Sequence, residues 1–185
     1  MFIAIKDTKV VAIHEVEWEC RRRVKGLSNP EYWTWLDSVT TITGTSPDEV
    51  KTVDYSGEDY EIVETDAPLS YESTVDGVTS TISFNQSGHI HKDGTYSLKW
   101  DASKKEIVKD DTAKATYDLA EEWKRIRAER NRLLAETDWV VIKARENGGQ
   151  VAEKWKTYRV GLRNIPSEQS DATKYSEITW PTKPE

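Results

Sequence analysis

The hydrophobic period of this chain changes near residue 112, and that change constrains the fold more than any other feature of the sequence. From there, six residues recur at spacings of four, three, four, three and four: Leu119, Trp123, Ile126, Arg130, Leu133 and Thr137. Such spacing places them on one stripe of a helix. The pattern predicts a helix from about residue 112 into the 140s, ending before Gly148 and Gly149.

A second helical pattern follows the two glycines. Val151, Trp155, Tyr158 and Leu162 recur at four, three and four residues, and Pro166 is expected to end this helix. The pair therefore predicts an αα-hairpin. Residues 178–184 carry two prolines and are expected to form an extended tail.

The first 111 residues carry strand patterns instead. Apolar runs at 2–5 and 10–13 predict one hairpin, and residues 50–55 and 60–63 predict a second around 56–59. The turn pairs at 76–77 and 93–94 predict a central meander within 71–109. Residues 15–36 mix charges with rings and are expected to be largely irregular. The predicted fold class is α+β: N-terminal antiparallel β-hairpins and a central β-meander, followed by the αα-hairpin with its extended tail.

Charge excludes some partners. The 185 residues include 26 Lys and Arg against 33 Asp and Glu, a net charge of −7, whereas a nucleic-acid partner requires a basic face. No apolar run approaches the length of a membrane span, and the N-terminus shows no signal-peptide pattern. The single cysteine, Cys20, forms no internal disulfide, so we expect the chain to be made in a reducing cytoplasm.

Few residues suggest chemistry. His89 and His91 alternate on a predicted strand and could chelate a metal, particularly if three copies met on an axis as in some phage fibres and spikes; two surface histidines are the simpler interpretation. Cys20 and His14 lack a third group and any active-site signature. The sequence therefore predicts no enzyme, no cofactor and no metal site beyond the remote alternative at His89 and His91.

Three motifs of the last third occur in a fixed order. Residues 127–139 read RAERNRLLAETDW, residues 155–166 read WKTYRVGLRNIP, and residues 178–184 read ITWPTKP. Together they resemble the C-terminal module of the tail-fibre assembly chaperone family of tailed bacteriophages, over about residues 120–185. Two positions depart from the family pattern, because Gly161 stands where a helix former is usual and Asn164 replaces an Asp.

The resemblance implies a protein that binds the phage tail fibre and assists its folding, trimerisation or attachment, in the host cytoplasm during assembly. The strand and helix patterns themselves predict a β-rich docking domain at 1–67, a β-meander at 68–111 and a helical module at 112–185, and the resemblance makes only this last module chaperone-like. The family positions that imply partner contacts are Arg130, Asn131, Trp139, Trp155, Tyr158, Arg159, Arg163 and Trp180.

Two further alternatives stay open at this stage. The protein could instead be a permanent component of the virion tail, such as a fibre adaptor or baseplate protein. Leu119, Ile126 and Leu133 in heptad register leave a homo-oligomer open. No nucleic acid and no membrane is expected among the partners.

Overall fold

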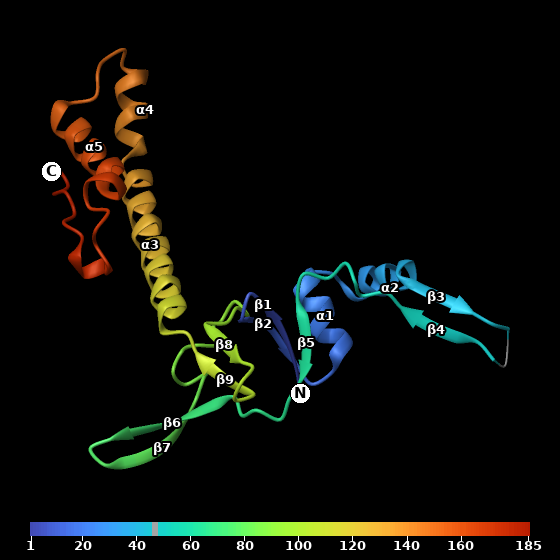
Figure 1. The fold of residues 1–185 in the computed structure, drawn as a ribbon. Coiled ribbons are helices and arrows are strands. Elements are labelled where there is room, and N and C mark those ends of the chain that lie inside the picture. Colours follow the sequence, from blue (N-terminus) through green and yellow to red (C-terminus); the bar gives the residue numbers. More distant parts are fainter. Residues whose placement is uncertain (46–47) are drawn as a thin grey trace. The chain divides into compact units, whose positions relative to one another are not determined.

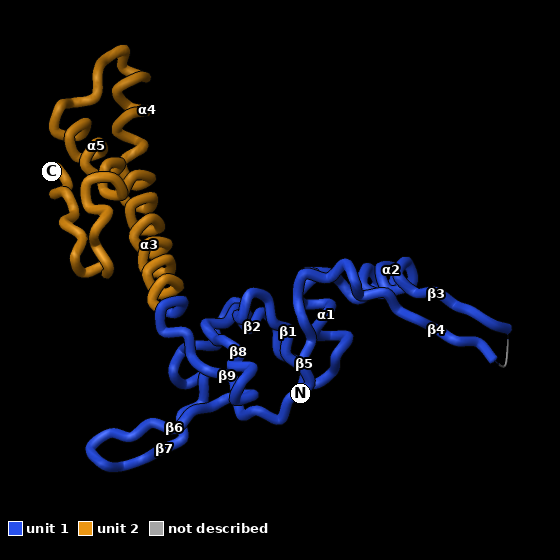
Figure 2. Tube along the Cα trace, viewed as in Figure 1, with its two compact units in different colours: residues 1–114 blue, residues 115–185 orange. Residues whose placement is uncertain are grey.

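A computed structural model describes residues 1–45 and 48–185 (Figure 1). The chain divides into two compact units, Met1–Lys114 and Ala115–Glu185 (Figure 2). Each unit is described below by itself. Within the described residues, no helix is long and apolar enough to cross a membrane.

The first unit contains a five-stranded antiparallel sheet. Its strand order is β5 (Glu61–Glu64), β1 (Phe2–Lys6), β2 (Lys9–His14), β8 (Leu98–Asp101) and β9 (Glu106–Lys109). The β1–β2 hairpin is as predicted, and Asp7 and Thr8 both take positive φ in its turn. One apolar cluster comprises Ile3, Ile5, Val10, Phe84, Leu98 and Ile107. A second cluster joins Ala4 and Ala12 to Cys20 of the first helix. The alternation of β1 thus supplies both clusters.

Residues 15–36 are not irregular, as the sequence pattern had suggested, but form α1 (Glu17–Lys25) and most of α2 (Asn29–Ser38). Local capping explains both helices. Gly26 ends α1 in the left-handed conformation at φ 65°. Ser28 and Glu31 form a capping box that starts α2. Both helices are short, and their apolar residues are mostly aromatic rings that alternate with charged residues. The helical period of hydrophobic residues is therefore hard to detect in the sequence.

The predicted hairpin over 50–63 is wrong. β4 (Val50–Val53) pairs with β3 (Thr40–Thr43), whereas β5 pairs with β1 in the main sheet. Ile62 and Val63 of β5 align with Ala4 and Ile3, so burial beside β1 outweighs the local turn signal at 56–59.

The Asp76–Gly77 turn does form the predicted hairpin, between β6 (Ser70–Val75) and β7 (Val78–Ser83). Both turn residues have positive φ, at 50° and 77°, which matches a two-residue hairpin loop. β8 and β9 belong to the main sheet instead, so the strands after residue 68 divide between two sheets. Around Asp93 and Gly94 only an isolated bridge forms, between Ile90 and Tyr96.

The second unit is helical, although its first helix begins before its boundary. α3 (Asp111–Ala135) and α4 (Asp138–Glu146) are separate helices, so the single long helix predicted here is interrupted at Thr137. α5 (Glu153–Glu168) continues past Pro166, which sits in its last turn and does not end it at that residue. A proline there removes one hydrogen bond just before the helix stops, which limits its cost.

The tail returns to the helices. After the short 3₁₀ turn η1 (Tyr175–Glu177), Ile178 is buried in a cluster with Trp123, Ile126, Tyr158, Leu162 and Ile165. The α+β class, with antiparallel strands before C-terminal helices, is confirmed. The functional roles assigned to 1–67, 68–111 and 112–185 stay predictions, although the sheet contains strands from both of the first two segments.

Candidate partner-binding surface

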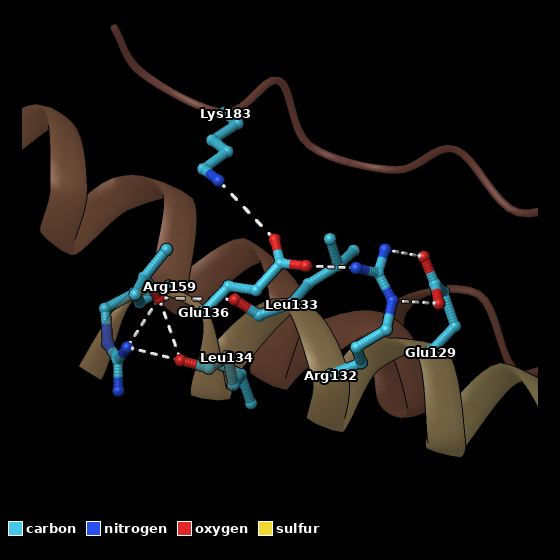
Figure 3. A network of polar contacts seen from close by, with 8 residues as sticks. Glu129, Arg132, Leu133, Leu134, Glu136, Arg159 and Lys183 are labelled. Atoms are coloured by element: carbon cyan, nitrogen blue, oxygen red, sulfur yellow. Dashed lines mark hydrogen bonds and ion pairs between the residues drawn. The ribbon is translucent and has the colours of Figure 1, made fainter. Parts of the chain in front are cut away.

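A buried arginine organises the turn between α3 and α4. Arg159 of α5 is 7% exposed and donates from Nη1 to the Leu134 carbonyl at 2.9 Å and to Thr137 Oγ1 at 2.6 Å. Its Nη2 donates to Asp138 Oδ1 at 2.7 Å. Figure 3 shows the guanidinium beside the end of α3. Because it satisfies carbonyl and hydroxyl oxygens where α3 stops, Arg159 positions the start of α4.

A row of ion pairs runs from α3 to the tail (Figure 3). Arg132 donates to Glu129 at 2.6 Å and also pairs with Glu136, whose other oxygen lies 3.4 Å from Lys183 Nζ. The hydrogen bond from Arg132 lowers the pKa of the Glu129 carboxyl. Glu129 is half-buried, whereas Arg132, Glu136 and Lys183 are exposed, so the row contributes modestly to the free energy of folding.

Three further contacts hold the tail. Gln169 follows α5, and its side chain makes two hydrogen bonds with the backbone of Thr179. Its Oε1 accepts from the Thr179 amide at 2.8 Å, and its Nε2 donates to the Thr179 carbonyl at 3.0 Å. The ring centroids of Trp180 and Tyr175 are 5.6 Å apart. A Cβ added at Gly161 would lie 3.3 Å from Pro181 Cβ, so the glycine that departs from the family pattern lets the tail approach α5.

α4 presents apolar side chains that the unit does not cover. Trp139 is 54% exposed and Ile142 is 55% exposed. The Trp139 ring meets Trp155 of α5 edge to face, with centroids 6.2 Å apart, and Lys143 Nζ lies 5.9 Å from the Trp139 ring. We call Trp139, Ile142, Lys143 and Trp155 the α4 patch. Exposed tryptophans beside aliphatic groups are typical anchors of protein interfaces.

The eight predicted contact residues divide by burial. Tyr158 and Arg159 are buried inside the unit, and burial raises the pKa of the Tyr158 hydroxyl. Trp155 and Trp180 are half-buried, and the Nε1 of Trp180 is buried with no hydrogen-bond partner among the residues that the structure describes. Asn131, Trp139 and Arg163 are exposed, whereas Arg130 is half-buried and donates to the Asn131 side chain at 2.8 Å.

The structure thus brings Trp139 and Trp155 together on one surface and buries Tyr158 and Arg159 beneath it. A partner-binding role for any of the eight stays a prediction. Ile142 is not among the eight predicted contact residues, although it lies three residues after Trp139 on α4 and is as exposed. That spacing of three was the available signal.

The two histidines are buried, not on the surface. His89 contacts Ser87 Oγ at 2.8 Å and Asp111 Oδ1 at 3.1 Å, through different ring nitrogens. His91 Nε2 contacts Ser97 Oγ at 2.7 Å. Among the described residues, no group of three or more His, Cys, Asp or Glu side chains could hold a metal ion. The histidines serve as hydrogen-bonding groups between strands, turns and the start of α3.

Cys20 and His14 likewise have structural contacts. The Cys20 thiol is fully buried, lies 3.7 Å from the Phe2 carbonyl, and has a pKa raised by burial to about 11. His14 Nδ1 accepts from the Val16 amide at 3.1 Å. A thiol with so high a pKa is a poor nucleophile near neutral pH.

One family of known proteins is similar to the helical region. Residues 123–185 match the phage tail assembly chaperone protein family. The matched segment is 63 of the 185 residues and contains the α4 patch, the Arg159 contacts and the whole tail. It agrees with the resemblance seen in the sequence motifs.

The phage tail assembly chaperone match supports a role in phage tail assembly, and such a role implies a protein partner. Searches of curated proteins and of solved structures gave no match. Residues 1–122 lie outside the matched segment.

Proposed function

We propose that this protein binds a phage tail-fibre protein and assists its folding, trimerisation or attachment. The observation that carries the proposal is the α4 patch, which lies within the segment matching the tail assembly chaperone family. Fibre chains bury their intertwined surfaces only after three chains meet, so their intermediates expose apolar strands that aggregate. A patch of two tryptophans and an isoleucine covers such a surface.

The chemistry of the module favours binding over catalysis. Lys143 lies beside the Trp139 ring, at the edge of the α4 patch. Cations at the rim of an apolar patch attract acidic groups of a partner and set its orientation. We therefore propose a non-enzymatic binding protein that requires no cofactor and acts in the host cytoplasm while fibres assemble.

The patch is tested by co-expression with the fibre protein encoded by the same phage. Trp139→Ala combined with Ile142→Ala is expected to reduce co-purification and the soluble yield of fibre. Leu119→Ala is the matched control, because Leu119 is also an exposed apolar residue of α3, at 40%. Equal fibre yield with both variants would refute the α4 patch as the contact.

Mass spectrometry of purified virions separates a transient chaperone from a permanent tail component. Absence from particles, together with fibre solubility that depends on co-expression, supports the chaperone. A fixed copy number per particle supports a fibre adaptor or baseplate protein that stays in the virion. Failure of both co-purification and solubility tests would remove the proposed function.

A further inference from the structure

The main sheet has an edge that faces a groove. β9 is the terminal strand of the five, and within residues 1–45 and 48–185 it pairs only with β8. Beside it lies a groove of about 460 Å³, lined by Glu106, Ile107, Val108 and Lys109 of β9 and by Pro68, Ser70, Tyr71 and Glu72 at the start of β6. Both strands belong to the first unit, outside the family match.

The hydrogen-bond pattern decides which backbone groups of β9 face outward. Asp110 N donates to Ser97 O, toward β8, whereas Trp100 N donates to Thr8 O, away from β9. Trp100 is opposite Ile107. Because hydrogen-bonded and non-hydrogen-bonded pairs alternate in an antiparallel ladder, the N–H and C=O groups of Ile107 and Lys109 point to the outer edge.

β6 has an outward edge of the same kind. Phe84 N donates to Leu69 O in the β6–β7 ladder. By the same alternation, the N–H and C=O groups of Ser70 and Glu72 point away from β7. The groove is therefore bordered by two strands whose outward backbone groups have no ladder partner in the described part of the chain.

Side chains give the groove its chemical preference. Tyr71 and Val108 are half-buried and offer apolar surface, whereas Glu72 and Glu106 are exposed. The cation of the groove, Lys109, is engaged within the chain, since its Nζ lies 4.8 Å from the Tyr71 ring and 3.6 Å from Asp111. The remaining charge is acidic, so the complementary occupant carries basic side chains.

We propose that this groove binds an extended segment of another protein, which adds to β9 as a sixth strand. The backbone of this segment forms hydrogen bonds with Ile107 and Lys109. Apolar side chains on its two faces contact Tyr71 and Val108 respectively, because successive side chains of a strand point to opposite faces. A Lys or Arg meets Glu72 or Glu106. Strand addition to an open sheet edge is a recurring mode of peptide recognition, with affinity from the main chain and specificity from alternate side chains. A second copy of this chain is the competing occupant, and the test below separates the two.

The test uses the full-length, isotope-labelled chain and three capped seven-residue peptides. One alternates Val and Thr between terminal Lys residues, the second replaces those Lys residues by Glu, and the third has a central Pro. The basic peptide is expected to shift the amide resonances of 70–72 and 106–109 and to protect the Ile107 and Lys109 amides from exchange. The acidic and Pro peptides are expected to bind about fivefold more weakly or worse.

Two pairs of variants place the contact. Lys109→Pro removes an outward N–H but no β8 bond, and is expected to weaken binding about fivefold relative to Lys109→Ala, which keeps that N–H. Glu106→Lys is expected to weaken binding of the basic peptide about threefold or more, whereas Glu61→Lys, on the opposite edge strand β5, leaves it unchanged. The second pair tests the proposal even if Lys109→Pro does not fold.

Three outcomes would overturn the proposal. They are shifts confined to β5 or to the β3–β4 hairpin, equal binding of the basic and acidic peptides, and the same resonance shifts appearing with protein concentration in the absence of peptide. The last result would assign the edge to a second copy of this chain. None of these results bears on the α4 patch, which is tested separately with the fibre protein.

Discussion

Arg159 Nη1 lies 2.6 Å from Thr137 Oγ1, and this contact joins the middle of α5 to the turn where α3 stops and α4 begins. Thr137 is fully buried and donates its own hydroxyl to the Leu134 carbonyl at 2.9 Å. The pair therefore fixes the direction of α4 and, with it, the exposure of Trp139 and Ile142.

Arg159→Ala is expected to lower the free energy of unfolding by about 2–3 kcal/mol, because it leaves the turn without its charged donor. Arg159→Lys recovers only part of the loss, since an ammonium group lacks the planar fork that reaches three acceptors. The change in the free energy of unfolding is measured on the full chain by urea titration, with hydrogen exchange of the α5 amides as the signal. Arg163→Ala, one turn later and exposed, should alter it by less than about 0.5 kcal/mol; similar losses for the two variants would contradict the role of Arg159.

Gly161→Val is expected to loosen the tail from α5, because its side chain would overlap Pro181, which already lies 3.3 Å from an added Cβ. The measurement is the hydrogen-exchange rate of the Thr179 amide, which donates a hydrogen bond to the Gln169 side chain. Exchange should accelerate about tenfold in Gly161→Val. Gly161→Ala should change it less, as the higher helix propensity of alanine offsets a shift of a few tenths of an ångström. Unchanged exchange in both variants would mean that Pro181 does not pack on this glycine.

Glu58→Gln should destabilise the first unit by about 3 kcal/mol. The carboxylate, 5% exposed, pairs with the buried Arg21 and lies 3.4 Å from Lys25 Nζ; it also accepts from the Tyr60 hydroxyl. Removing its charge takes away the buried partner of the Arg21 guanidinium, which keeps only the more exposed Glu17, at 2.9 Å, of its two carboxylate partners among the described residues. Asp59→Asn is the control, because its ion pair with Lys6 is exposed and such pairs contribute little. Chemical denaturation followed by exchange of the β1 and β5 amides distinguishes the two variants.

Asp110 makes the first unit sensitive to acid. The Ala113 amide, at 3.1 Å, and then Lys99, at 3.0 Å, lower the pKa of this carboxyl. A lowered folded-state pKa contributes stability that is present above the unfolded value near pH 3.9 and is lost as pH falls through the folded value.

Denaturation between pH 6 and pH 2.5 should therefore show a steeper loss of stability in the unmodified chain than in Asp110→Asn. Asparagine retains a side-chain acceptor before α3, so this variant keeps most of the helix start. Identical pH profiles for the two proteins would show that Asp110 has no linked proton.

Local signals predicted much of the fold. The turn residues predicted the β1–β2 and β6–β7 hairpins, and the apolar stripe through Trp123 and Ile126 predicted α3. Pairing between distant strands could not be predicted from the sequence. β5 pairs with β1, more than 50 residues away in the chain, although the turn signal at 56–59 had predicted a local hairpin with residues 50–55. Likewise Glu58 lies within the turn predicted at 56–59, but its carboxylate is buried against Arg21 and Lys25 of α1.

By itself, the sequence determined the change from strand period to helix period near residue 112 and the motif order that matches the tail assembly chaperone family. Both are local properties, because turn chemistry, helix period and motif spacing act between neighbours in the chain. Only the tertiary structure decided that Arg159 is internal while Trp139 and Ile142 stay exposed, and that β9 ends its sheet beside a groove. Burial and strand pairing depend on which distant segments meet, and no local spacing encodes that meeting.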